Sequence, residues 1–562
     1  MKNKWGIVVS AEKLSCLELW SRARLCPTTM LLTVLTLLLS TAAQANTNND
    51  EAAAEKSPSF LVSNIVIEGE NPLSDSDTRQ ILSAYSDRQM TIETLREAAT
   101  EVEKALALDG YNFYRANLPP QQLQDNVVRL QIQRIDIADV RVTGNQFFSG
   151  DNIQRSLPLV SAGRSPNTRK IASALILAED NPAKDIRVVF VKGEQPQTVD
   201  ANITVSDKNP NEMYFWANNA GSALTTRSRI GGQYHHRNLW GRDHQVALSY
   251  TISPEDSDEL SQYGINYRVP VYGWRGMANV FYSRSDADTG RVADVFDISG
   301  AGETYGVGYT QYLNKTEDYQ HRLGVDLIDK LFDSDILFDA TNIGSDVRSR
   351  PLIIEYTGRL DRNNWLLTGV VSHATNLSGG SFNNDESYAL SRAGADSDWS
   401  KQGLSLRLDY RWSRDWRSQV LLFAQSTSDL LISGEKFGMG GSLGDFGPRG
   451  FFEREVVVDE GYKASFELNR NFSTRRMQLG VFFDYATGDQ NNPQAGESPE
   501  ETLSSIGVSY KWGIRPDLSL DLDYGYVLDG VDQRFSDGTD DGDSRLHVSL
   551  RYFPRWPWGG SK

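Results

Sequence analysis

The side chains of this sequence that could do chemistry form no recognisable catalytic centre. His235, His236 and His244 lie close in sequence, but neighbouring residues of a strand face opposite sides, which disfavours a shared metal site. A second group is an acidic run that fits either calcium or a solvated outer loop: Asp537, Asp540, Asp541 and Asp543. No glycine-rich phosphate loop opens a helix, and no nucleophile lies beside a placed base. We therefore expect no enzyme, cofactor or metal site, with calcium at the acidic run as the open alternative.

A third candidate is an isolated arginine, Arg449, in a segment too rich in glycine for a regular helix or strand. Residues 437–452 contain six glycines and one proline, together with Phe446 and Phe451, whose rings favour burial. This composition predicts a loop that folds back and packs. Because alternating apolar and polar residues lie on both sides, the loop interrupts a sheet that continues after it.

Composition narrows the class of protein. Hydrophobic residues make up 39% of the 562 residues and the mean hydropathy is −0.45. These values argue against a helical membrane bundle, because each spanning helix needs about 20 mostly apolar residues. They leave a membrane barrel open, because its inward residues are polar. The 23 Tyr and 12 Trp suit aromatic girdles, although a soluble β-protein could also carry them.

The N-terminus has the organisation of a secretory signal peptide. Basic residues precede a short apolar run at 30–39, and Ala43-Gln44-Ala45 has the form of a signal-peptidase site. We expect residues 1–45 to be removed and residues 46–58 to form a flexible leader. The only cysteines, Cys16 and Cys26, would leave with the signal, so the mature chain would lack disulfides and cysteine ligands.

Charge disfavours a general nucleic-acid binder. Removal of the five basic and two acidic residues before position 46 changes the net charge from −17 to −20. Such an acidic chain repels the phosphate backbone, and we expect no nucleic-acid partner.

Two similar modules follow the leader. In residues 59–134, a strand at 60–68 precedes two helices and two strands, with Thr91 at a helix start and Asp109-Gly110 as a stop signal. Residues 135–207 repeat the plan. The pattern predicts two α+β domains with the order β-α-α-β-β.

Residues 208–553 contain sixteen segments with the alternation of β-strands. These segments are 213–220, 226–237, 243–253, 260–269, 275–284, 302–313, 319–330, 351–360, 365–373, 402–412, 417–425, 462–469, 477–485, 503–512, 518–527 and 545–553. Short turns alternate with longer acidic loops. An even number of antiparallel strands predicts a bacterial outer-membrane barrel, because lipid forbids an open sheet edge. A soluble β-sandwich would leave the signal peptide and the paired modules unexplained.

Alternation also places Asp484 inside the barrel. In residues 477–485 the apolar residues Leu479, Val481 and Phe483 would face lipid, so Phe482 and Asp484 would face the lumen.

The end of the first module resembles the first POTRA domain of two-partner secretion transporters, the TpsB proteins of the FhaC/ShlB/HecB type. The residues that carry the resemblance are Gly110, Tyr111, Arg115, Leu118, Pro119 and Gln121. The second module is similar to the second POTRA domain of that family, and opens with Val142-Thr143-Gly144-Asn145. The resemblance extends from about residue 60 to residue 553.

The arginine loop resembles the same family. Its members carry a glycine-rich sixth extracellular loop ending in Val-Arg-Gly-Phe/Tyr. Here Gly440 and Gly441 precede Pro448-Arg449-Gly450-Phe451, which has proline in place of valine. In the family this arginine meets an aspartate of a Phe-x-Asp-like motif, which Phe482-Phe483-Asp484 matches. The resemblance implies that residues 428–458 fold into the barrel and that Arg449 pairs with Asp484; two separate solvated charges are the alternative.

The resemblance implies protein secretion. The POTRA domains would bind an unfolded exoprotein through its N-terminal secretion domain, by addition of a strand to an exposed sheet edge. The exoprotein would then cross the outer membrane through the barrel and fold outside. Other implied partners are outer-membrane lipid and the barrel-assembly machinery, which would recognise Tyr552-Phe553 before the tail at 554–562. Alternatives are an insertase of the same superfamily and a passive porin, although a diffusion pore needs no docking arm.

Overall fold

The computed structural model describes residues 7–9, 58–221, 226–255, 260–285, 290–292, 296–298, 302–316, 318–333, 337–338, 341–342, 346–442, 447–494, 497–532 and 538–554. Phe446, Asp537 and nearly all of the expected signal peptide, leader and C-terminal tail lie outside these ranges. The chain divides into two compact units, Ala11–Arg134 and Ile135–Lys562 together with Met1–Ser10. Among the described residues, no helix combines the length and apolarity that crossing a membrane requires.

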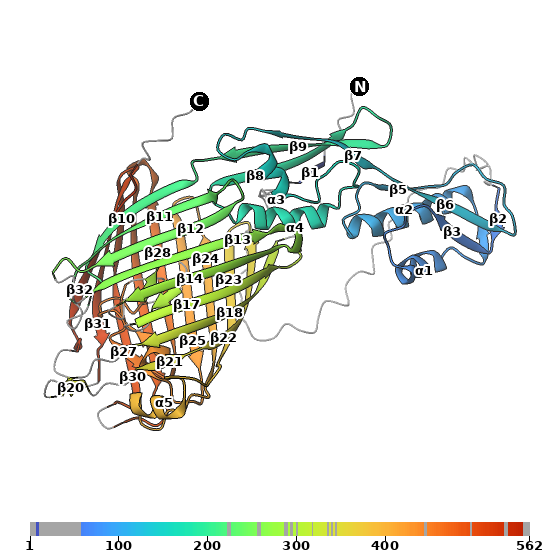
Figure 1. The fold of residues 1–562 in the computed structure, drawn as a ribbon. Helices are drawn as coiled ribbons and strands as arrows, with labels where there is room; N and C mark the ends of the chain where they lie inside the picture. Colours follow the sequence, from blue (N-terminus) through green and yellow to red (C-terminus); the bar gives the residue numbers. More distant parts are fainter. Residues whose placement is uncertain are drawn as a thin grey trace, which may run out of the picture. The chain divides into compact units, whose positions relative to one another are not determined.

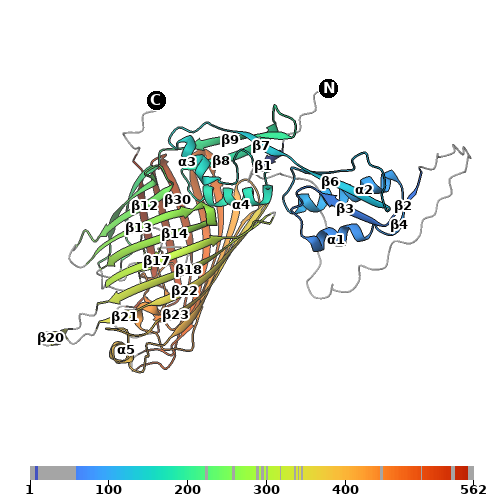
Figure 2. The same ribbon diagram turned by 45° about the vertical axis from the view of Figure 1, so that its right-hand side comes forward.

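The first unit is a small α+β domain (Figure 2). Its elements are β2 (Phe60–Val62), β3 (Asn64–Glu68), α1 (Asp75–Ser83), β4 (Arg88–Met90), α2 (Ile92–Leu108), β5 (Tyr114–Asn117) and β6 (Val127–Arg134). The sheet has the order β3-β6-β5, with β3 parallel to β6, while β2 pairs with β4. The short strand β4 is an addition to the predicted plan.

Helix α2 forms the core of this domain. Its N-cap Thr91 accepts a hydrogen bond from the backbone of Thr94. The buried face of α2 follows the helical period: Leu95, Ala98, Ala99, Val102 and Leu106. This face belongs to the same apolar cluster as Val128 and Leu130 of β6, so burial of one helix stripe on the sheet holds the domain together.

The second α+β domain contains β7 (Asp136–Thr143), α3 (Gly150–Ser156), α4 (Thr168–Glu179), β8 (Lys184–Lys192) and β9 (Thr198–Asp207). Its sheet order is β1-β8-β9-β7. Strand β1 (Ile7–Val9), which lies in the expected signal peptide, pairs with the edge of β8 in antiparallel register. The edge of β8 therefore accommodates an added strand.

The rest of the chain closes into an antiparallel barrel, whose tilted strands are visible in Figure 1. The strands are β10 (Asn211–Asn218), β11 (Arg229–Leu239), β12 (His244–Ile252), β13 (Ser261–Val271), β14 (Gly276–Ser285), β17 (Gly302–Tyr312), β18 (Tyr319–Phe332), β21 (Val347–Ser349) with β22 (Pro351–Arg362), β23 (Trp365–Asn376), β24 (Ser400–Arg411), β25 (Trp416–Ser426), β28 (Glu460–Phe472), β29 (Met477–Asp489), β30 (Glu500–Arg515), β31 (Leu518–Asp529) and β32 (Ser544–Tyr552). β10 pairs with β32, so the sheet has no open edge.

β21 and β22 both pair with β18 and are separated only by Arg350. They are therefore one interrupted strand, and the predicted count of sixteen is confirmed. Alternation along β29 also agrees with the expected faces: Val481 is 53% exposed, whereas Phe482 is 2% and Asp484 1% exposed.

The outer loops contain additional short elements that the alternation did not predict. These are β15 (Gly290–Val292), β16 (Phe296–Ile298), β19 (Leu337–Phe338), β20 (Thr341–Asn342), α5 (Asp385–Ser391), β26 (Phe437–Met439) and β27 (Val456–Val458). The expectation that residues 437–452 form no strand is wrong at their start, because β26 pairs with β27. This pairing satisfies the backbone groups of β26 despite the glycine between its two apolar residues.

Candidate functional site: the loop inside the barrel

The loop between β25 and β28, called the pore loop (residues 428–458), packs against the inner wall of the barrel. Five of its buried apolar residues are Phe437, Met439, Phe451, Val456 and Val458. They belong to one cluster with Ala486, Leu503 and Val527 of β29, β30 and β31. Removal of this apolar surface from water favours the docked position of the loop.

Two of the predicted glycines are required by the turn that leads to the loop tip. Gly440 and Gly441 have φ angles of +100° and +109°, which side chains rarely adopt. A Cβ atom on Gly440 would lie 2.6 Å from the carbonyl oxygen of Phe452. The backbone N–H of Gly441 donates to the carbonyl oxygen of Pro448 over 3.0 Å, so this turn brings the tip residues back onto the hairpin.

Arg449 lies at the centre of a compact polar site. Its Nε and Nη2 donate to the two carboxylate oxygens of Asp484 over 2.8 and 3.0 Å, and its backbone N–H donates to Asp484 Oδ2 over 3.0 Å. Nη1 donates to Glu467 Oε2 over 2.8 Å and lies 3.7 Å from Asp523 Oδ1. The guanidinium carbon lies 3.4 Å from the ring centre of Phe482. The structure thus brings Arg449, Asp484 and Phe482 together.

Rigid strands supply the acidic partners, which we call the acidic seat: Glu467 on β28, Asp484 on β29 and Asp523 on β31. Ser465 donates to Asp484 Oδ1 and Ser509 donates to Glu467 Oε1. These bonds orient the carboxylates through residues of the barrel strands alone. The seat is shielded from water, since the side chains of Asp484 and Glu467 are 1% and 9% exposed.

The other predicted tip residues surround the arginine. The backbone N–H of Gly450 donates to Nε2 of His547 on β32 over 3.0 Å, and Phe451 is fully buried. Glu467, Asp523 and His547 were not predicted. Alternation marks their positions as inward-facing, but it does not indicate which inward positions converge on one loop.

A second anchor, also not predicted, has the opposite charge. Glu435, which ends the short 3-10 helix η2 (Ser433–Glu435), is 1% exposed and lies 3.0 Å from the ammonium groups of both Lys330 and Lys401. Ser349 donates to the same carboxylate over 2.9 Å. The lysines belong to β18 and β24. The loop is therefore held at two places on the wall. Arg449 of the loop binds carboxylates of β28, β29 and β31, and Glu435 of the loop binds lysines of β18 and β24.

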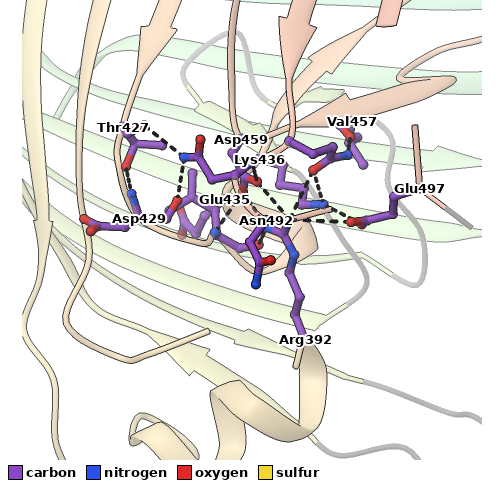
Figure 3. Close-up of polar contacts among 12 residues, drawn as sticks. Arg392, Thr427, Asp429, Glu435, Lys436, Val457, Asp459, Asn492 and Glu497 are labelled. Atoms are coloured by element: carbon purple, nitrogen blue, oxygen red, sulfur yellow. Dashed lines mark hydrogen bonds and ion pairs between the residues drawn. The ribbon is translucent and has the colours of Figure 1, made fainter. Parts of the chain in front are cut away.

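The base of the pore loop is tied to its neighbouring outer loops, as Figure 3 shows. Arg392, which follows α5, makes a buried ion pair with Asp459. The backbone N–H groups of Leu431 and Asn491 donate to the same carboxylate, and Lys436 lies 3.0 Å from Glu497 of the loop between β29 and β30. These contacts fix the two ends of the pore loop at the outer rim.

At the other end of the barrel, the second α+β domain is joined to a barrel turn by a buried ion pair. Lys184 Nζ lies 2.6 Å from Asp243 Oδ2, and the two side chains are 0% and 1% exposed. Tyr272 donates to the same oxygen over 2.6 Å, and Asn152 donates to the carbonyl oxygen of Gly241 over 2.7 Å. Burial lowers the pKa of Lys184, and Asp243 opposes this shift. We call this contact the periplasmic joint.

The predicted POTRA residues stabilise the return from β5 to β6. Gly110 has a φ of +85° and directly follows Asp109, the C-cap of α2. The side-chain amide of Gln121 donates to the carbonyl oxygen of Arg129 and accepts from its backbone N–H, each over 2.8 Å, as a paired strand would. Arg115 donates to two carbonyl oxygens, Tyr111 packs edge-on against Tyr114, and Leu118 packs on the core. The Pro119 carbonyl oxygen accepts a bond from Gln121.

The described ranges contain no cluster of three histidine, cysteine, aspartate or glutamate side chains arranged to bind a metal ion. His235 bonds to Gln233, and His244 bonds to Tyr267. Of the acidic run, Asp540 and Asp543 are joined by a backbone-to-carboxylate hydrogen bond of 3.0 Å.

Comparison with known proteins places these features in a family. Residues 60–134 match the family model of the POTRA domain, ShlB-type, and residues 198–512 match that of the haemolysin secretion/activation protein ShlB/FhaC/HecB. The heme/hemopexin transporter protein HuxB of Haemophilus influenzae (strain 86-028NP) is 18% identical over 476 residues, which cover 80% of each chain. For HuxB of strain Rd, the match is 20% identical and spans 34% of the relative's length.

Solved structures share the fold. CdiB from Escherichia coli is 16% identical with a TM-score of 0.69, covering 90% of this chain and 92% of that one. CdiB from Acinetobacter baumannii is 15% identical with a TM-score of 0.65, covering 89% and 91%. The second family model matches more than half of the chain. The chain therefore belongs to the haemolysin secretion/activation family ShlB/FhaC/HecB, outer-membrane barrels with periplasmic POTRA domains that translocate a secreted exoprotein.

Proposed function

We propose that this chain binds one large exoprotein in unfolded form through its POTRA domains and passes it through the barrel to the cell surface. The observation that carries the proposal is the pore loop. The loop packs on the inner wall of the barrel. Its tip is attached to the wall mainly by ion pairs and is carried by a glycine-rich turn. Such a loop closes the lumen at rest and can leave when cargo arrives.

The cargo would first meet an open sheet edge. β8 already pairs with one added strand, β1, in the register Ile7–Phe190 to Val9–Val188. Once the signal peptide is removed, this edge is free to bind an extended segment of the exoprotein, because backbone hydrogen bonds give affinity without requiring one sequence. The N-terminal secretion domain of the exoprotein is the segment we expect there.

Disulfide trapping tests this step, since the mature chain has no cysteine of its own. Val189→Cys places a thiol on the half-buried face of β8, and Thr204→Cys places one on the central strand β9 as a matched control. With cysteines introduced along the secretion domain, we expect the exoprotein to cross-link to V189C and not to T204C. Equal cross-linking at both positions would contradict docking at this edge.

Affinity purification of the full-length protein from secreting cells, with mass spectrometry of the proteins that co-purify, separates the alternatives. An insertase would co-purify with several unfinished barrel proteins, and secretion would continue without the gene. A passive porin would co-purify with neither kind of protein. One exoprotein that is lost from the medium on deletion of the gene supports secretion. Outer-membrane lipid around the barrel and the barrel-assembly machinery during biogenesis complete the partners we propose.

A further inference from the structure

The acidic seat contains more negative charge than the pore loop neutralises. Three carboxylates face one guanidinium group, and Lys511 of β30 makes no ion pair with any of the three among the residues that the structure describes. Oδ1 of Asp523 is buried and accepts no hydrogen bond from any residue that the structure describes. The seat therefore has acceptor capacity that Arg449 leaves unused.

The shape of the seat is specific for a planar cation. Asp484 binds the Nε–Nη2 edge of the guanidinium with two oxygens, Glu467 binds the Nη1 corner, and Phe482 covers one flat face at 3.4 Å. Carboxylate forks and aromatic faces together suit arginine better than lysine. All of these groups belong to barrel strands, whereas their occupant is carried by a glycine-rich loop. The seat therefore persists when the loop moves.

We propose that the acidic seat is a binding site for arginine side chains of the translocating chain, and that Arg449 is a built-in ligand which such a side chain displaces. This inference rests on the proposed secretion function. A one-for-one exchange preserves the ion pairs and the aromatic contact. Departure of Arg449 without a replacement leaves three poorly hydrated carboxylates without their nearest cation, which is strongly unfavourable.

Exposure gives the incoming side chain a route. Asp523 is the most exposed of the three carboxylates, at 19%, and lies farthest from Arg449. An arginine that pairs first with Asp523 lies beside Glu467. From this position it can replace Arg449 first at Glu467 and then at Asp484. The loop itself stays tied at its base by the Arg392–Asp459 pair, so the displaced hairpin, including β26 and β27, swings aside about that base and returns after passage.

Single-channel recording on the full-length protein in planar bilayers tests the exchange. The probe is an unstructured Gly-Ser peptide with several arginines, added on the POTRA side, and the matched probe has lysines. We expect the arginine peptide to increase the fraction of time that the channel is open. The lysine peptide should need about a tenfold higher concentration for the same effect, because lysine makes one charge-assisted contact fewer. Asp523→Asn should raise the half-effective arginine-peptide concentration about tenfold, while the exposed Glu386→Gln leaves it unchanged.

Arg449→Ala provides a second readout that does not depend on opening. Its vacated seat should bind the arginine peptide more tightly than the wild type in a calorimetric titration, because competition is removed. Equal responses to arginine and lysine peptides, or an unchanged response in D523N, would overturn the inference. Secretion of the exoprotein by the same wild-type cells would show that this failure does not extend to the proposed function.

Discussion

The periplasmic joint and the acidic seat are both built around a largely buried cation. They differ in the number of carboxylates that face the cation and in the kind of segment that carries it. At the joint, one lysine faces one carboxylate at 2.6 Å, and both side chains are inaccessible. At the seat, one arginine on a glycine-rich loop faces three carboxylates and remains 13% exposed. A pair of equal and opposite charges between a strand and a barrel turn suits a permanent connection. A site with excess negative charge, occupied by a glycine-rich loop, suits a contact that is broken and remade.

The largest effect is expected at the joint. Lys184→Met leaves Asp243 buried without its cation, which should destabilise the docked domain by about 3–5 kcal/mol. Limited proteolysis and thermal unfolding in detergent measure this loss. The exposed Lys192→Met on the same strand should change little, and adding Asp243→Asn to Lys184→Met should recover part of the stability. Equal behaviour of K184M and K192M would contradict the role of the joint.

A smaller effect is expected at the seat. Arg449→Lys keeps the charge but loses the fork that binds Asp484, so the docked loop should lose about 1.5–3 kcal/mol. Bilayer recordings should show a roughly tenfold to hundredfold higher ratio of open to closed time. Wild-type gating in R449K would mean that the arginine geometry does not hold the loop.

The second anchor should contribute less. Glu435→Gln removes one anion, but Lys330 and Lys401 are 17% and 19% exposed and can turn toward lumen water. We expect a loss of about 1 kcal/mol, visible as brief openings, and an additive effect with Arg449→Lys because the anchors lie on different strands. Strong non-additivity would show that the two anchors act as one unit.

The last expected effect concerns the pH dependence of stability in the α+β domain beside the joint. Burial, and secondarily Asp185, raises the pKa of Glu179 on α4 to about 7 from its ordinary value of 4.5. Between these values the native state binds more protons than the unfolded state, so the free energy of unfolding falls as pH rises through this window. Glu179→Gln should flatten this dependence and be more stable than wild type at pH 8. If the stability of E179Q depended on pH in the same way as that of the wild type, Glu179 would not be the group that causes the pH dependence.

The sequence predicted the barrel well because alternation is a local property. Each strand shows its two faces in its own residues, and lipid permits only a closed, even arrangement. The pairing of Arg449 with Asp484 came from the resemblance to a family, supported by the inward position of Asp484 on its strand.

What the sequence did not predict depends on contacts between distant segments. Glu467 and Asp523 look like any other inward polar residue until three strands bring them to one point. Lys330, Lys401 and Glu435 carry no pattern that relates them. Likewise, Phe437–Met439 becomes a strand only because Val456–Val458 supplies hydrogen bonds across the loop, which local propensity does not report.

The central claim is that the pore loop leaves its place on the wall while cargo passes. Val456 of β27 belongs to the pore loop, is 2% exposed and packs against the wall residues Ala486, Leu503 and Val527, so Val456→Cys, a near-isosteric change, reports undocking of the loop. Membrane-impermeant maleimide should label V456C in cells that are secreting the exoprotein and spare it in cells without the exoprotein, while the exposed Glu386→Cys labels in both. Continued secretion with V456C fully protected would contradict the account.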